Sequence, residues 1–256
     1  MTATGNVTRM DQRVTVVTGG GRGIGAAICL RLARAGHDIA FGYLSDGAAA
    51  EETAERVRAL GVRCLAVRMD TTVEADVDRL FDIAAAELGP VTGLVNNAGV
   101  TGPLTKLVDA RLEDMQRVVD VNVIGYLLCM RRAARDMTAA GNGGSIVNIS
   151  SGAATRGSPG EYVHYAGAKA AVDSITNGLA QELGADGIRV NSVQSGIVRT
   201  RIHQDMGDAS RLERRGALTP LGRPGEPDEI ANAVAWLMSD EASWTSGAVL
   251  RVAGGS

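Results

Sequence analysis

Residues 14–25 read VTVVTGGGRGIG, a β-branched run that leads directly into a cluster of glycines. Apolar residues at helical spacing follow (Ile24, Ile28 and Leu32), so the pattern indicates a strand, a tight turn and an amphipathic helix. Glycines let the backbone approach a pyrophosphate closely, and the free N–H groups at the helix start meet its charge. A plain strand-to-helix turn could carry the same glycines. With its flanking strand and helix, the stretch predicts a phosphate-binding loop.

Beyond this loop, β-rich runs continue to alternate with helical patterns. The runs cover residues 14–17, 38–43, 63–69, 93–96, 145–149, 189–193 and 248–252. Alternation of this kind predicts a parallel sheet covered on both faces. We therefore predict one doubly wound α/β domain with a Rossmann fold of about seven strands over residues 13–256. Residues 1–12 are expected to form a flexible tail, and the polar insertion at 199–216 to form a substrate lid.

Composition excludes several classes of protein. The net charge of −3 comes from 26 basic and 29 acidic residues that are interspersed, so no basic stripe predicts a nucleic-acid partner. No apolar run reaches the roughly 20 residues of a membrane span, and no signal peptide is apparent, which predicts a cytoplasmic protein without a membrane partner. Cys29, Cys64 and Cys129 lie in apolar stretches without metal-ligand spacing, nor do His37 and His203 show such spacing. We expect reduced core thiols and no metal site.

The end of the second strand bears on the choice of nicotinamide cofactor. An acid there would bind the ribose hydroxyls of NAD and repel the extra phosphate of NADP, but the sequence has Tyr43 at that position. Arg22 offers a charged fork to a 2′-phosphate, with Ser45 as a nearby hydroxyl donor. Asp46 keeps NAD possible, because an error of one residue in the predicted end of the strand would bring this carboxylate close to the ribose hydroxyls. The sequence favours NADP.

A proton-transfer group is indicated by Tyr165 and Lys169, which lie four residues apart on one face of a predicted helix. Lowering a phenol pKa by three units takes about 4 kcal/mol. One positive charge at about 4 Å supplies that much at an effective dielectric of about 20. We therefore expect Lys169 to lower the pKa of Tyr165. Strand alternation sends Ser150 and Ser151 to opposite faces, and we expect Ser151 to face the site.

Five motifs occur in one order: Thr18-Gly19-x-x-x-Gly23-x-Gly25, Asn96-Asn97-Ala98-Gly99, Asn122, Ser151 and Tyr165-x-x-x-Lys169. Together they resemble the signatures of the classical short-chain dehydrogenase/reductase family, over about residues 13–254. The resemblance implies that Asn122 joins Lys169 to a water chain, that Asp70 lies near the adenine ring, and that Thr200 contacts the nicotinamide carboxamide. Asn96 to Gly99 would support the cofactor, and a homotetramer is expected.

Together, the residues and the resemblance predict an NADP-preferring oxidoreductase that reversibly reduces the carbonyl of a small molecule, with Tyr165 as proton donor. A sugar or polyol dehydrogenase and a non-catalytic NAD(P)-binding sensor are the alternatives. The predicted catalytic residues are Asn122, Ser151, Tyr165 and Lys169. The predicted cofactor-binding residues are Gly19, Gly21, Arg22, Gly23, Ile24, Gly25, Tyr43, Ser45, Asp70, Thr71, Asn97, Ala98, Gly99, Tyr165, Lys169, Gly196, Val198 and Thr200.

Two departures from the family pattern affect the predicted site. Ser151 and Tyr165 are one residue further apart than usual, so the loop between them is expected to bulge. Gln194-Ser195-Gly196 stands where Pro-Gly is usual, which restores a backbone N–H and leaves the loop less rigid. Thr101, Gly152, Tyr162 and His203 are pocket candidates, His164 is expected to lie at a rim or to pack, and Trp236 and Trp244 are expected to pack.

Overall fold

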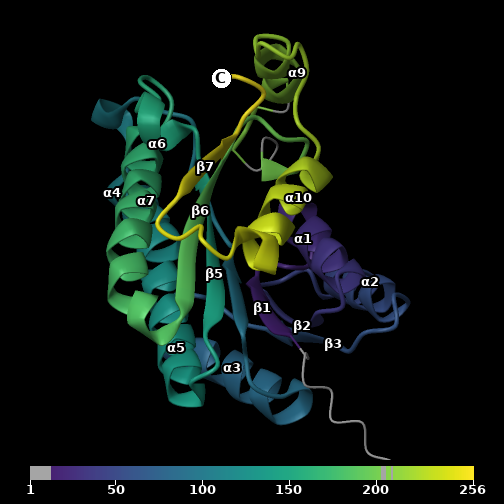
Figure 1. Cartoon of the computed structure of the whole chain (residues 1–256). Helices are drawn as coiled ribbons and strands as arrows, with labels where there is room; N and C mark the ends of the chain where they lie inside the picture. The colour runs from purple at the N-terminus through teal and green to yellow at the C-terminus, as the bar shows by residue number, and fades with distance from the viewer. Residues whose placement is uncertain (1–12, 203–205, 209) are drawn as a thin grey trace, which may run out of the picture.

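A computed structural model describes residues 13–202, 206–208 and 210–256 of the chain (Figure 1). The expected tail at 1–12 and the pocket candidate His203 lie outside these described residues. The sheet has seven parallel strands in the order β3-β2-β1-β4-β5-β6-β7. They are β1 (Val14–Thr18), β2 (Asp38–Tyr43), β3 (Cys64–Arg68), β4 (Gly93–Asn96), β5 (Gly144–Ser151), β6 (Ile188–Ser195) and β7 (Val249–Val252).

Helices cover both faces of the sheet (Figure 1). One face carries α1 (Gly23–Arg34), α2 (Gly47–Arg58) and α10 (Pro227–Met238), and the other carries α3 (Glu74–Leu88), α5 (Gly125–Ala140) and α7 (Val163–Leu183). The shorter elements are η1 (Leu107–Asp109), α4 (Leu112–Val119), η2 (Asp120–Ile124), α6 (Ala153–Arg156), η3 (Gly184–Asp186), α9 (Arg211–Gly216) and η4 (Asp240–Ala242). The predicted doubly wound α/β fold is confirmed.

The central strands are buried along nearly their whole length because both of their faces are covered. Every residue of β1 is buried, with Val16 and Val17 on opposite faces of the sheet. Each face then buries its own apolar cluster, one against α1 and α10 and the other against α3, α5 and α7. A strand in a parallel sheet therefore reads as a continuous apolar run rather than as an alternating pattern.

Strand order reverses beside β1, which pairs with β2 on one side and with β4 on the other. At such a switch point the connections leave in opposite directions, so a crevice opens at the carboxyl ends of the strands. The glycines that follow β1 and the Asn-Asn-Ala-Gly run that ends β4 lie at this crevice. The fold thus brings together the motifs that the sequence keeps about 80 residues apart.

Sequence and structure differ at several points. The strands β5 and β6 extend to Ser151 and Ser195, beyond the predicted ends at 149 and 193. The expectation that both tryptophans pack is wrong: the side chain of Trp244 is 100% exposed and that of Trp236 is 39% exposed. Both lie near the edge strand β7, beyond which the described part of the chain has no further strand.

The cysteine prediction agrees with the structure. Cys29, Cys64 and Cys129 are buried and free. Burial raises the pKa of Cys64 and of Cys129 to about 12, so these thiols stay protonated at neutral pH.

Within the described part of the chain, no three His, Cys, Asp or Glu side chains form a cluster that could hold a metal ion. A search of the same residues finds no helix both long and apolar enough to span a bilayer.

The longer loop between Ser151 and the helix α7 is accommodated by local structure. The four-residue helix α6 follows Gly152 and ends at Gly157, which has a φ of 71°. Ser158 comes next with a φ of 46°, the left-handed region that side chains other than glycine seldom adopt. The predicted bulge is therefore a short helix and a sharp turn that return the chain to the start of α7.

Candidate active site

The phosphate loop is shaped by its glycines. Gly19 has a φ of 67°, and a Cβ at Gly25 would overlap the carbonyl oxygen of Gly19. The loop opens onto the N-terminus of α1, whose first turn carries no acidic residue and no side-chain cap. Its N–H groups and positive end therefore face the crevice, which is the arrangement that binds a phosphate.

A cavity of about 760 Å³ extends from this loop along the carboxyl ends of the strands. Its size is within the range of ligand sites in proteins. The predicted residues that line it are Gly19, Gly21, Arg22, Gly23, Ile24, Gly25, Tyr43, Ser45, Asp70, Thr71, Asn97, Ala98, Gly99, Tyr165, Lys169 and Thr200. The glycine cradle, the helix N-terminus and the length of the cavity fit a dinucleotide.

Residues that the sequence analysis missed also line this cavity. They include Leu44, Met69, Val100, Arg117, Val121, Arg199, Arg201, Ile202 and Leu212, and they lie alongside Asp46, the acid that keeps NAD possible. No short motif marks them, because they reach the cavity from several different elements and from the segment after β6. Asp46 could have been placed from its N-cap pattern, since it precedes the alanine-rich helix α2.

The far end of the cavity carries the residues that bear on cofactor choice. β2 ends at Tyr43, as predicted, so no acid stands at the strand end. Asp46 instead caps α2, where its Oδ1 accepts a hydrogen bond from the backbone N–H of Ala49 at 3.1 Å. Its other oxygen lies 4.0 Å from Nη1 of Arg201. Arg22 precedes α1 and lines the same cavity.

A second cavity, of about 620 Å³, adjoins the first. Ser151 and Tyr165 line it together with three predicted residues, Gly196, Val198 and Thr200. Thr101 and Tyr162 of the pocket candidates also line it, while the third candidate within the described residues, Gly152, lies beside its wall. Because Tyr165 and Thr200 border both cavities, they lie at the junction between them.

Ser151 and Tyr165 meet despite the longer loop between them. Ser151 is the last residue of β5, and its side chain lies close enough to the phenol of Tyr165, in the first turn of α7, to affect the pKa of that phenol. Burial raises the pKa of Tyr165 well above its usual value, although the nearby Ser151 side chain acts in the opposite direction. The phenol therefore holds its proton at neutral pH, as a proton donor must.

Lys169 lies one turn further along α7 and is buried. Its Nζ donates to the carbonyl oxygen of Ile149 at 2.8 Å and to the hydroxyl of Tyr126 at 3.0 Å. The ammonium also lies 5.9 Å from the ring centre of Tyr165. Burial lowers the pKa of Lys169 to about 7, against an opposing effect of Asp173.

These contacts correct one expectation from the sequence. We expected Lys169 to lower the pKa of Tyr165, but the structure raises it, because both groups are removed from water and desolvation dominates. The sequence argument assumed a fully charged lysine about 4 Å away. A buried lysine with a pKa near 7 supplies only part of that charge at neutral pH.

Asn122 lies within η2, a π-helical segment that joins α4 to α5. Its Nδ2 donates to the carbonyls of Val118 and Val100, at 2.9 and 2.7 Å, while its buried Oδ1 has no hydrogen-bond partner among the described residues. A Cβ built on Gly99 would lie 2.9 Å from this Oδ1 and 3.6 Å from Nζ of Lys169. Both polar atoms therefore flank the same glycine, and single π-turns of this kind are frequent at functional sites.

Ser195, which stands where the family usually has proline, ends β6 and borders both cavities. Its hydroxyl donates to the carbonyl oxygen of Ser150 at 3.2 Å, and its own carbonyl accepts from the N–H of Gly152 at 2.9 Å. These two bonds tie the loop to β5, which is a restraint that the loss of proline alone would not predict. His164 lies beside Tyr165, and neither of its ring nitrogens has a partner within the described structure.

Comparison with known proteins agrees with this geometry. A family model described as enoyl-(acyl carrier protein) reductase matches residues 19–256. The cis-4-hydroxycyclohexanecarboxylate dehydrogenase of Sinomonas cyclohexanicum is 40% identical, over 95% of this chain and 96% of that protein. The L-rhamnose 1-dehydrogenase (NAD(P)(+)) of Sphingomonas sp. (strain SKA58) is 36% identical, over 96% of each chain.

A similar solved structure is that of a blue fluorescent protein from a metagenomic library, in complex with NADPH. It superimposes with a TM-score of 0.86 at 36% identity, over 95% of this chain and 97% of that one. The chain belongs to the short-chain dehydrogenase/reductase family. It is an oxidoreductase of that family, which acts on carbonyl and alcohol groups.

Proposed function

We propose that this chain is an NADP-preferring oxidoreductase that reversibly reduces a carbonyl to an alcohol, with Tyr165 as the proton donor. The observation that carries the proposal is the phenol of Tyr165, which lies at the junction of the two cavities and lines the smaller one beside Ser151. A nicotinamide cofactor bound in the larger cavity would supply the hydride. The smaller cavity would then hold the substrate carbonyl between the two hydroxyl groups.

The side chains divide the work of proton transfer. Ser151 orients the substrate oxygen, and Tyr165 donates the proton to it. Once the proton has left, Tyr165 is a phenolate, and the positive charge of Lys169 stabilises it because the ammonium lies near the Tyr165 ring. We propose that Oδ1 of Asn122 and Nζ of Lys169 hold the two ends of a water chain that returns a proton to this site, because both atoms flank Gly99.

The first experiment is turnover of a panel of ketones, aldehydes and secondary alcohols by the purified protein with each nicotinamide cofactor. A sugar or polyol dehydrogenase is a second candidate, because L-rhamnose 1-dehydrogenase is among the relatives. Faster oxidation of aldoses and polyols than of simple secondary alcohols would favour that candidate. No turnover of any member of the panel would contradict both.

The preference for NADP rests on the end of β2. The expected result for Tyr43→Asp is about 10- to 100-fold weaker binding of NADPH, because a carboxylate there would face the 2′-phosphate. Binding of NADH should be unchanged or tighter. Tyr43→Asn is the matched control, since it makes the same change in shape without the charge. Titration of each variant with both reduced cofactors measures the effect, and tighter binding of NADH than of NADPH by the unaltered protein would overturn the preference.

We propose that residues 199–216 act as a lid over the substrate. Thr200 and Ile202 of this segment border both cavities, and Arg211 and Arg215 of α9 border the smaller one. Arg211 is anchored across that cavity by a bidentate ion pair with Glu161, at 2.6 and 2.8 Å. The ion pair would hold α9 over the site.

Two exposed apolar surfaces support the proposed homotetramer. Trp244 and Val249 lie at the edge strand β7, and Leu112 of α4 and Leu127 of α5 are also exposed apolar side chains. Exposed apolar surface and an open sheet edge are features that oligomers bury.

Trp244→Glu is therefore expected to shift the tetramer to a dimer, because a charge would be buried at one of the two interfaces. Light scattering after size-exclusion chromatography measures the mass. Leu60→Glu is the control, since Leu60 is also exposed but follows α2 at the opposite edge of the sheet. A monomeric unaltered protein would contradict the proposal, and so would a Trp244→Glu variant that remains a tetramer.

A further inference from the structure

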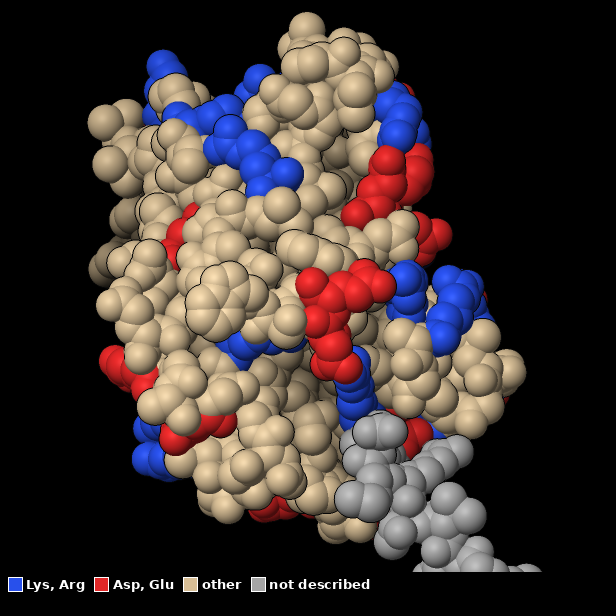
Figure 2. Space-filling view, in the orientation of Figure 1, with Lys and Arg blue, Asp and Glu red and all other residues tan. Residues whose placement is uncertain are grey.

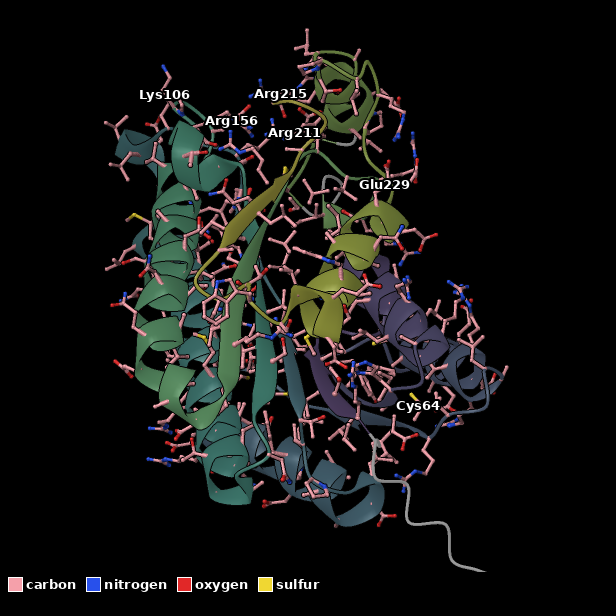
Figure 3. All side chains as sticks on the ribbon, in the orientation of Figure 1. Cys64, Lys106, Arg156, Arg211, Arg215 and Glu229 are labelled. Carbon is pink, nitrogen blue, oxygen red and sulfur yellow. The ribbon has the colours of Figure 1, made fainter. Side chains whose placement is uncertain are left out.

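The wall of the smaller cavity carries an excess of arginine. Arg156, Arg211 and Arg215 line it, and Figure 3 shows all three at the same end of the molecule. Glu161 is the acidic side chain among the residues that line it. Figure 2 shows Lys and Arg gathered at this upper end, while the rest of the visible face mixes both signs. Positive charge is therefore concentrated where the substrate would enter.

Two of these arginines share a single counter-ion. Arg211 binds both oxygens of Glu161, and Arg215 lies 2.6 Å from the same carboxylate. The Arg211 side chain is 6% exposed and also donates to the hydroxyl of Tyr162 at 2.7 Å. Its buried Nε has no partner within the described residues. The cluster thus keeps one positive charge after Glu161 is counted.

Arg156 adds a charge that no carboxylate of the described residues neutralises. It ends α6, and its guanidinium lies over Gly152, with Nη1 2.9 Å from the position that a Cβ on Gly152 would take. Gly152 directly follows Ser151, and the Cα atoms of consecutive residues lie close together. The guanidinium of Arg156 therefore lies beside the serine that would hold the substrate carbonyl. The side chain is exposed, which leaves its fork open to a ligand. Ser256 also lines the cavity, and a terminal carboxylate there would still leave one net positive charge.

We infer that the substrate carries a carboxylate, which binds Arg156 while its carbonyl lies between Ser151 and Tyr165. This inference rests on the proposed function and specifies the substrate class of the same site. A guanidinium binds a carboxylate through two parallel N–H bonds, which fixes direction as well as position. Because Arg156 lies next to Ser151, the compounds that fit are oxo acids, and the corresponding hydroxy acids, with a few bonds between the two groups.

The test compares 5-oxohexanoate with its methyl ester, which has the same carbonyl and chain without the charge. Binding of each to the NADP⁺ complex is measured by calorimetry, and turnover is measured with NADPH. We expect the acid to bind about 10- to 100-fold tighter than the ester, the range expected for hydrogen bonds to a charged group. Arg156→Gln should remove that difference and leave the ester unaffected, whereas Arg156→Lys should keep part of it.

Lys106→Gln is the matched control, because it removes a positive charge at the same end from a residue outside the cavity wall (Figure 3). It should leave the preference for the acid unchanged. Equal binding of acid and ester by the unaltered protein would overturn the inference, as would a preference that survives Arg156→Gln. Turnover of neither compound, with tight binding of the acid alone, would count against the proposed reaction and support the charge-based inference.

Discussion

Tyr165→Phe is expected to lower kcat by about 10²- to 10⁴-fold, the contribution of a positioned general acid. The substitution removes one oxygen and keeps the buried ring, which packs edge-on against Tyr162 with centroids 5.3 Å apart. The fold and the cofactor cavity should therefore persist. Steady-state turnover on the best substrate of the panel measures kcat, and a fluorescence titration measures the Kd of NADPH.

Tyr162→Phe provides the comparison for this prediction, since it removes the same atom from a neighbouring buried ring. Its hydroxyl accepts from Arg211, so the expected loss of kcat is no more than a few-fold. Equal losses in the two variants would mean that the phenol of Tyr165 acts through packing. Loss of NADPH binding by Tyr165→Phe would show damage to the cavity instead. The turnover that remains in Tyr165→Phe would then be compared with the turnover of Ser151→Ala.

Gly25→Ala is expected to weaken NADPH binding by at least about 100-fold. Its Cβ would overlap the carbonyl oxygen of Gly19, so the phosphate loop must move by a large part of an ångström or more. Displacements of about 1 Å commonly cost about 10²-fold in sites of this precision. Unfolding free energy should also fall by about 1–3 kcal/mol, as for other overpacked positions. The Kd from titration and the denaturation midpoint measure the two effects.

Gly178→Ala separates the overlap from the general effect of an added methyl group. Gly178 lies on the exposed side of α7, and its added Cβ would meet nothing within 4 Å. This variant should bind NADPH normally and gain up to about 1 kcal/mol of stability, because alanine favours a helix over glycine. Normal cofactor binding by Gly25→Ala would show that the loop does not form the phosphate site.

Much of the fold could be predicted because its signals are local. The β-branched run of β1, the glycines after it and the periodic apolar residues of α1 each specify the structure of their own segment. The strand ends were harder to place. Ser151 and Ser195 are polar residues that still pair in the sheet, since each lies opposite the other in the ladder between β5 and β6. A pattern based on apolar residues stops before them.

The contacts of Lys169 were beyond local signals. Tyr126 lies 43 residues earlier in the chain, yet its hydroxyl accepts from the ammonium of Lys169 and donates to the carbonyl of Ile149. Only the packing of α5 and α7 against β5 brings these groups together. The same burial determines the direction of the pKa changes, which is why an argument from charge alone gave the wrong sign for Tyr165.

The exposed tryptophan shows a similar limit. Trp244 was expected to pack because large aromatic side chains usually do, and within one chain it does not. Its position beside β7 became visible only with the strand order, which leaves β7 at an edge. The proposed role of Arg156 in substrate binding could not be predicted for a related reason. It depends on the cavity that the guanidinium borders rather than on the neighbours of Arg156 in sequence.

Tyr165 is proposed to donate the proton while the hydride moves, and a single turnover isolates that step from product release. NADPH-saturated protein is mixed with excess carbonyl substrate, and the decay of the nicotinamide absorbance is followed in the unaltered protein and in Tyr165→Phe. The expected decay is at least about 100-fold slower in the variant, at equal cofactor occupancy. A decay within about threefold of the unaltered protein would contradict the proposed role of Tyr165.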